Sequence, residues 1–266
     1  MTVKNGIVTF ECDKSPSGEE IINSSQRNNE LVWPSTEDKP RAQYRTSWKN
    51  MCNVTSYVMA LEYAGWNFPV GQYKQPEDNL GKFILTSKEV IDKYAKECPA
   101  MYKSFLRCLE GQCSQKELEN VYFPNELHDY LCFGANKWIG STAAKFNTNI
   151  DFKKALWKFM VKDNLPMVIS TKFGGFGHIV CVTGVQYTEA DYNAHKDDTE
   201  LPSLKPISII VDDPWGKYNP KTNKYDAPNN GNDIIVPWDR VVTTVKPCDS
   251  ETVKWAHTFN HGIATV

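Results

Sequence analysis

Cys52 and His178 are the residues whose types and surroundings most directly suggest chemistry. Cys52 begins an amphipathic stretch with helical spacing, and His178 begins an apolar run that is typical of a β-strand. A thiol and an imidazole are two of the three parts of a cysteine nucleophile site, in which the imidazole removes the thiol proton. We expect the third part, a carboxylate or amide that orients the imidazole, on a later strand.

The segment after Asn50 predicts the helix that positions the thiol. Apolar residues recur at helical spacing over residues 54–61, Gly65 supplies an end signal, and Asn50 is a candidate N-cap. A helix start carries unpaired N–H groups and a partial positive charge, so a thiolate in the first turn would be stabilised. A buried structural role is the common alternative for a cysteine, but the polar neighbours of Cys52 favour a nucleophile.

A glycine-rich loop and a pair of carboxylates frame His178. The glycines of residues 174–177 permit close approach of the backbone and suit one lip of a cleft. The alternative is that His178 has a structural role and only forms a hydrogen bond with a nearby carbonyl. Asp212 and Asp213 end a later strand and point to opposite faces, so only one of them can meet His178. Pro214 favours an extended conformation at Asp213, which we prefer as the partner. Asp212 is then expected to face solvent, and a simple turn start is the alternative for both.

The order of the elements predicts an α+β fold. Helical patterns fill residues 68–150, and a further helix follows Asp151, which is its candidate cap. Strand-like runs then follow at Met167–Thr171, Ile179–Val185, Ile207–Val211 and Ile234–Val236. A helical first half and a stranded second half indicate helices packed on one antiparallel sheet. Residues 1–18 are polar and rich in turn formers, so we expect an N-terminal extension there and one catalytic domain over residues 19–266, with a helical insertion at 68–150.

Composition narrows the class of protein. A chain of 266 residues with 41% hydrophobic content can bury a full core. A net charge of -2 with scattered Lys and Arg argues against nucleic acid as a partner. No stretch approaches the roughly 18 apolar residues of a membrane span, and the first residues lead into no apolar signal core. We therefore expect no membrane insertion and synthesis in the cytoplasm without a signal peptide.

The remaining cysteines and histidines suggest no metal or other cofactor. The eight cysteines are spaced irregularly and include no Cys-x-x-Cys pair, although a local disulfide among Cys98, Cys108 and Cys113 stays open. His257 and His261 have the spacing of some zinc ligands but lack a clear third ligand, so we expect surface histidines. A zinc amidase that uses one of these histidines or His178 together with Cys52 is a disfavoured alternative.

Three motifs resemble papain-fold cysteine peptidases related to the bacteriocin-processing peptidases. These motifs are Cys52-Asn53-Val54-Thr55-Ser56, Met167-Val168-Ile169 followed by Gly177-His178, and Val211-Asp212-Asp213-Pro214. The resemblance covers residues 20–65 and 150–245 and implies a papain-like fold. It also implies a catalytic triad of Cys, His and an Asp that stands immediately before a proline, which corresponds to Cys52, His178 and Asp213.

The resemblance further implies a glutamine upstream of the cysteine that helps to form the oxyanion hole. The short spacing of the family would place it near Thr46, where this sequence has no glutamine. Gln26 and Gln43 are the candidates, and Gln26 ranks first if residues 30–42 are an insertion. Asn50 is a further candidate donor, with helix capping as its alternative role.

The resemblance implies hydrolysis of amide bonds in a peptide or peptidoglycan substrate. The Asn- and Lys-rich form of the cysteine motif, with no transporter module, transmembrane segment or signal peptide in the sequence, is similar to phage and prophage lysins. This favours a peptidoglycan endopeptidase or amidase that reaches the cell wall after release. The alternatives are a protein-directed peptidase, a transglutaminase-like acyl transferase, and a non-catalytic peptide- or glycan-binding domain with Trp215 and Trp238 as its platform.

Overall fold

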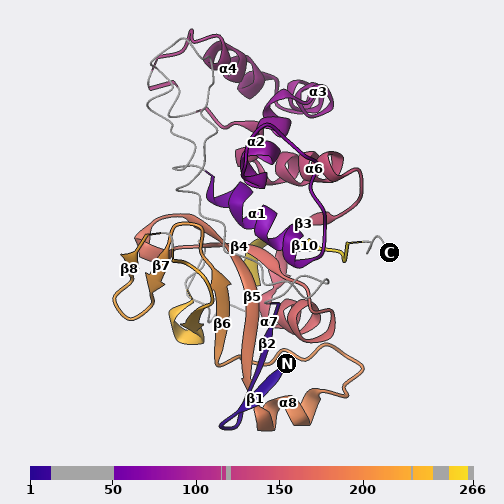
Figure 1. Ribbon diagram of the computed structural model, residues 1–266, viewed down its shortest axis with the longest axis vertical. Helices are drawn as coiled ribbons and strands as arrows, with labels where there is room; N and C mark the ends of the chain where they lie inside the picture. The colour runs from indigo at the N-terminus through magenta and orange to yellow at the C-terminus, as the bar shows by residue number, and fades with distance from the viewer. Residues whose placement is uncertain (13–50, 115, 118–120, 229, 242–251, 263–266) are drawn as a thin grey trace.

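A large antiparallel sheet forms one part of the molecule (Figure 1). The computed structural model describes residues 1–12, 51–114, 116–117, 121–228, 230–241 and 252–262. Within these residues the sheet has eight strands, which are β1 (Thr2–Lys4), β2 (Ile7–Glu11), β3 (Ala144–Asp151), β4 (Met167–Thr171), β5 (His178–Thr188), β6 (Ser208–Asp212), β9 (Ile234–Pro237) and β10 (Thr252–Phe259). A separate two-stranded hairpin consists of β7 (Lys217–Asn219) and β8 (Lys224–Ala227).

Helices gather at the other end of the molecule, with α1 between them and the sheet (Figure 1). They are α1 (Cys52–Tyr63), α2 (Pro76–Thr86), α3 (Lys88–Glu97), α4 (Pro99–Leu109), the short 3-10 turn η4 (Pro124–Glu126) and α6 (His128–Ile139). Near the sheet lie α7 (Phe152–Leu156), the π-helical turn η5 (Trp157–Lys162), the 3-10 turns η6 (Phe173–Gly175) and η7 (Trp238–Arg240), and α8 (Glu189–His195). None of the helices in the described ranges combines the length and the apolar character needed to span a bilayer.

Strand β5 organises the sheet because it has three partners. Its first half pairs with β4 and its second half with β2 along one edge, while β6 pairs along the other edge. The sheet continues from β4 through β10 to β3, and from β6 to β9. Since all of these pairs are antiparallel, the start of β5 lies beside the end of β6.

Helix α1 is buried on nearly every side because it packs against β5 and β4 on one side and against α2 on the other. Its side chains from Val54 to Leu61 are fully buried, including Thr55 and Ser56, whereas an amphipathic helix would bury only one face. The N-cap position is Met51, without a side-chain capping bond, and the candidate cap Asn50 lies outside the described residues. The predicted cap of the later helix is confirmed, because the Asp151 carboxylate accepts a hydrogen bond from the N–H of Lys154.

The predicted α+β class is confirmed, with helices in the first half and an antiparallel sheet in the second. The four predicted strand regions correspond to β4, β5, β6 and β9. Each of these strands is rich in β-branched residues that pack against the sheet surface.

Six strands of the described residues lie outside the predicted ones, namely β1, β2, β3, β7, β8 and β10. Residues 7–11 form β2, which places Val8 and Phe10 in the core, so this part of the predicted extension is instead a strand of the sheet. Strand β3 occupies the end of the segment that was predicted to be helical, and β10 fills the position between β3 and β4. The division at residue 18 stays a prediction, since residues 13–50 lie outside the described ranges.

Candidate active site

His178 and Asp213 form a buried hydrogen-bonded pair where β5 begins and β6 ends. His178 is the first residue of β5, and Asp213 follows the last residue of β6 directly. The Nε2 atom of His178 lies 2.7 Å from Oδ1 of Asp213, and the two side chains are 2% and 0% exposed. The structure therefore brings together two residues that are 35 positions apart in the sequence.

Asp213 is held by donors on both of its carboxylate oxygens. Oδ1 also accepts a hydrogen bond from the N–H of Trp215 at 2.8 Å, and Oδ2 accepts one from the hydroxyl of Tyr225 at 3.0 Å. The backbone is fixed as well, because the Asp213 N–H donates to the carbonyl of Gly231 at 2.8 Å. An acceptor surrounded by donors in this way suits an ionised carboxylate.

Cys52 lies at the N-terminus of α1 and interacts with the His178 ring, whose pKa it helps to raise. Its side chain is partly exposed, in contrast to the buried pair that it adjoins. With Nε2 of His178 directed at Asp213, Nδ1 is the ring nitrogen left for the thiol. The order sulfur, imidazole, carboxylate is the arrangement in which a base activates a nucleophile and a third group orients the base.

The charge state of His178 follows from its neighbours. Burial lowers the pKa of the ring, but the negative charge of Asp213 and hydrogen bonds with Asp213 and Cys52 act in the opposite direction and raise the pKa to about 10. The site therefore favours imidazolium, whose positive charge attracts a thiolate at Cys52.

Asp212 differs from its predicted position, because it is fully buried rather than facing solvent. Its Oδ2 accepts a hydrogen bond from the hydroxyl of Tyr63 at 2.6 Å, and its Oδ1 accepts one from the N–H of Asp233 at 2.9 Å. Burial raises the pKa of this carboxyl to about 6. The two adjacent carboxylates do point to opposite faces, but α1 supplies Tyr63 on the face of Asp212 and closes it to water.

The candidate oxyanion donors Gln26, Gln43 and Asn50 lie outside the described ranges, so their roles stay predictions. The backbone N–H of Cys52 belongs to the first turn of α1, whose N–H groups have no acceptor within the helix. The first helical bond in this turn runs from the N–H of Thr55 to the carbonyl of Met51 at 2.8 Å.

His257 and His261 were both predicted to lie at the surface, and the structure bears this out for His261 alone. His257 is not a surface residue, since β10 is an inner strand and the ring is 1% exposed, with its Nε2 3.1 Å from Nδ1 of His128. His261 is exposed, as predicted, and bonds the carbonyl of Asp163. No cluster of three or more His, Cys, Asp or Glu suited to a metal ion occurs among the described residues.

The structure tests the disulfide and part of the tryptophan platform considered from the sequence. Cys98, Cys108 and Cys113 form no disulfide with one another. Trp238 is 5% exposed and stacks on Phe152, which removes it from any surface platform.

Two tyrosines at the site were not predicted from the sequence. Tyr225 bonds Asp213 from the β7–β8 hairpin, and Tyr63 bonds Asp212 from the C-terminal end of α1. Neither lies in a recognisable motif, because each contact joins residues distant in the sequence. The only sequence signal for Tyr63 is its position near the end of the helix that Cys52 begins.

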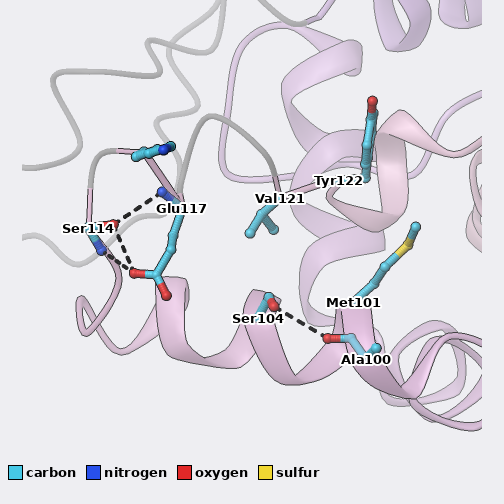
Figure 2. A pocket seen from close by; sticks show the side chains of 8 residues that line it. Ala100, Met101, Ser104, Ser114, Glu117, Val121 and Tyr122 are labelled. Atoms are coloured by element: carbon cyan, nitrogen blue, oxygen red, sulfur yellow. Dashed lines mark hydrogen bonds between the residues drawn. The ribbon is translucent and has the colours of Figure 1, made fainter.

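A separate concavity of about 500 Å³ lies on the helical part of the molecule (Figure 2). Its lining comes from α4 and the segment after it, and consists of Ala100, Met101, Ser104, Ser114, Lys116, Glu117, Val121 and Tyr122. The Glu117 carboxylate on its rim accepts hydrogen bonds from the N–H and the hydroxyl of Ser114. None of Cys52, His178 and Asp213 lines this concavity, so it is distinct from the triad.

Comparison with protein families gives a match over most of the chain. A family model described as the Peptidase_C39 like family matches residues 36–241, a range that contains Cys52, His178 and Asp213. No curated protein matches the chain.

Proposed function

The chain belongs to the Peptidase_C39-like family of papain-like cysteine peptidases, and on this premise we propose that it is a peptidoglycan endopeptidase or amidase of phage-lysin type. In this proposal Cys52 is the nucleophile, His178 the general base and acid, and Asp213 the group that orients His178. The observation that carries the assignment is the buried hydrogen bond between His178 and Asp213, with Cys52 interacting with the same imidazole ring.

The proposed reaction is covalent acyl transfer to water. The Cys52 sulfur, whose proton has passed to His178, attacks the carbonyl carbon of the scissile amide, and the carbonyl oxygen becomes an oxyanion. The N–H of Cys52 and further donors stabilise that charge. When the oxyanion collapses, the C–N bond breaks and His178 gives its proton to the leaving amine.

Water completes the cycle. His178, now neutral, takes a proton from a water molecule as its oxygen attacks the thioester carbonyl. Collapse of the second tetrahedral intermediate breaks the C–S bond and releases the acid product and the Cys52 thiolate beside protonated His178. Asp213 holds the ring in one orientation throughout both halves.

The family supports a peptide substrate, and the form of the cysteine motif supports the bacterial cell wall as its source. The Asn- and Lys-rich run at Cys52 resembles phage and prophage lysins. A peptide stem of peptidoglycan offers the amide bonds that such a triad cleaves.

The test is digestion of purified bacterial cell walls. We expect the wild-type protein to clear them and to release free amino groups, and we expect Cys52→Ala to lose at least about 1000-fold in rate, because the nucleophile is removed. Cys98→Ala is the matched control, since Cys98 is also a partly exposed free thiol but lies at the start of α4. Mass spectrometry of the products identifies the bond that is cut.

Other products would contradict the proposal in different ways. Release of reducing sugars instead of amino groups would exclude amide cleavage. Cleavage of unfolded proteins without any effect on cell walls would favour a protein-directed peptidase. Covalent incorporation of an added primary amine would favour a transglutaminase-like acyl transferase over a hydrolase.

A further inference from the structure

The β7–β8 hairpin brings a hydroxyl group to the outer oxygen of the Asp213 carboxylate. Tyr225, on β8, donates to Oδ2 at 3.0 Å, while Oδ1 receives His178 at 2.7 Å. The Asp213 side chain is fully enclosed, so Tyr225 supplies a bond to Oδ2 that bulk water is not placed to supply.

The hairpin is anchored on the glycine-rich loop that precedes His178. Asn223, in the turn between β7 and β8, accepts hydrogen bonds at its Oδ1 from the N–H of Gly174 at 3.0 Å and from the hydroxyl of Tyr218 at 2.9 Å. The ring of Tyr218 stacks on Phe173 with centroids 4.2 Å apart. Tyr225 therefore belongs to a hairpin that is fixed against the same loop that positions the base.

The surroundings of the Tyr225 ring leave it little freedom. It meets the His178 ring edge-on at 6.2 Å and stacks on Phe176 at 6.0 Å. A methyl group added at Gly174 would lie 2.9 Å from Cε2 of Tyr225, and Gly174 itself has a φ of +70°, so the glycine is required for this packing.

The hydroxyl of Tyr225 also keeps its proton. Burial, and next the negative charge of Asp213, raise the pKa of Tyr225 well above its ordinary value. The group therefore remains a hydrogen-bond donor over the whole pH range in which a cysteine peptidase works.

We propose that Tyr225 is a positioning residue of the active site, whose hydroxyl holds the Asp213 carboxylate with Oδ1 directed at His178. The inference rests on the triad of the proposed function and adds a fourth residue to it. Tyr225 acts through Asp213 and takes no part in bond making at the substrate.

The test uses Tyr225→Phe, which removes the hydroxyl and keeps the ring. The reactivity of Cys52 toward iodoacetamide is measured by mass spectrometry between about pH 4 and pH 9, so that no substrate has to be known. Loss of a donor to a charged acceptor is expected to slow alkylation at neutral pH about tenfold. It is also expected to move the acid limb of the pH profile to higher pH, because the charged carboxylate has lost a partner.

Tyr130→Phe is the matched control, since the Tyr130 hydroxyl also donates to a carboxylate, that of Glu97 at 3.1 Å, but in the helical part of the molecule away from Asp213. We expect it to leave the pH profile unchanged. A second measurement repeats Tyr225→Phe in an Asp213→Asn background, where the substitution should have little further effect if it acts through Asp213.

Three results would overturn the positioning role. They are an unchanged profile for Tyr225→Phe, an equal change for Tyr130→Phe, and a Tyr225→Phe effect of the same size in the Asp213→Asn background. Failure of the triad itself has a different signature, because His178→Ala would then alkylate at Cys52 as fast as the wild type.

Discussion

At the scale of single residues, the surroundings of each carboxyl group decide its chemistry more than its type does. Asp213 is enclosed by donors and faces an imidazole, whereas Asp212, one residue earlier, is held by Tyr63 on the opposite face. Glu77 is a further acidic residue whose surroundings differ from those of the exposed acids on the surface. Glu77 is fully buried in the first turn of α2.

Glu77 should make the stability of the protein depend on pH. Burial raises the pKa of this carboxyl from 4.5 to about 7, and repulsion from Asp78 and then Glu62 adds to the shift. Between these two pH values the folded state binds a proton that the unfolded state releases, so the free energy of unfolding falls as pH rises through this window. The loss from this group is roughly 3 kcal/mol, at 1.36 kcal/mol per pKa unit, and it persists above pH 7.

We expect Glu77→Gln to remove this loss, because the amide has no charge to bury. Urea unfolding at about pH 5 and about pH 8 measures it, since each condition yields a free energy of unfolding. Glu189→Gln is the matched control, because Glu189 lies in the first turn of α8 and is exposed. If Glu77→Gln and the wild type lost the same stability between the two conditions, the buried carboxyl would not be the source.

At the scale of elements, two side-chain hydrogen bonds join α1 to the sheet, and each ends beside a residue of the proposed triad. The hydroxyl of Ser56 donates to the carbonyl of Ile179 at 3.1 Å, next to His178. The hydroxyl of Tyr63 donates to Asp212 at 2.6 Å, next to Asp213. These bonds set the position of α1, and with it Cys52, relative to the strands.

Tyr63→Phe should weaken this connection. The substitution leaves Oδ2 of the buried Asp212 without its donor, which we expect to cost about 1–3 kcal/mol in the free energy of unfolding. We also expect slower alkylation of Cys52, since α1 is less firmly placed. Urea unfolding and iodoacetamide labelling measure the two effects.

The control for this prediction is Tyr187→Phe. Tyr187 is also buried, but its hydroxyl has no hydrogen-bond partner within the part of the chain that the structure describes. Its removal should be nearly neutral. Equal losses in Tyr63→Phe and Tyr187→Phe would show that the bond to Asp212 contributes nothing specific.

Local periodicity explains which elements were predictable from the sequence. Helix α1 and strands β4, β5, β6 and β9 carry strong apolar patterns of period 3.6 or long β-branched runs. Strand β3 is rich in Lys, Asn and Thr and half exposed, so it is stabilised by pairing with β10 rather than by its own sequence. Strand β2 does alternate between buried and half-exposed residues, a signal that its polar neighbours obscured.

The residues of the candidate site can likewise be divided into those that local sequence patterns predict and those that depend on tertiary contacts. Cys52, His178 and Asp213 were predicted because each begins or ends an element in a motif with a known resemblance. The burial of Asp212 and the contact of Tyr225 depend on how α1 and the hairpin dock on the sheet, which no local pattern encodes. The upstream glutamine stays a prediction.

At the scale of the whole molecule, the N-terminal residues support the strand that carries His178. Strand β2 pairs with the second half of β5, and its Val8 and Phe10 enter the core, where Phe10 packs on Tyr192 of α8. Strand β2 is therefore part of the sheet that carries His178.

Phe10→Ala should destabilise the entire domain. Phe10 is 7% exposed, and truncation of a buried phenylalanine costs about 3–5 kcal/mol. Val3→Ala on β1 is the control, because Val3 is 52% exposed and should change stability by no more than about 0.5 kcal/mol. Thermal and urea unfolding measure both variants, and similar effects for the two would argue against a core role for residues 7–11.

The position of β10 has a consequence for the order in which the protein is made. This strand lies between β3 and β4, yet its residues leave the ribosome after those of both neighbours. During translation, β3 and β4 are therefore synthesised with no strand to bridge them, and the sheet joins up only when residue 259 has emerged. A nascent chain that already contains Cys52, His178 and Asp213 still lacks this bridge, so β3 and β4 are joined only after these three residues have been made.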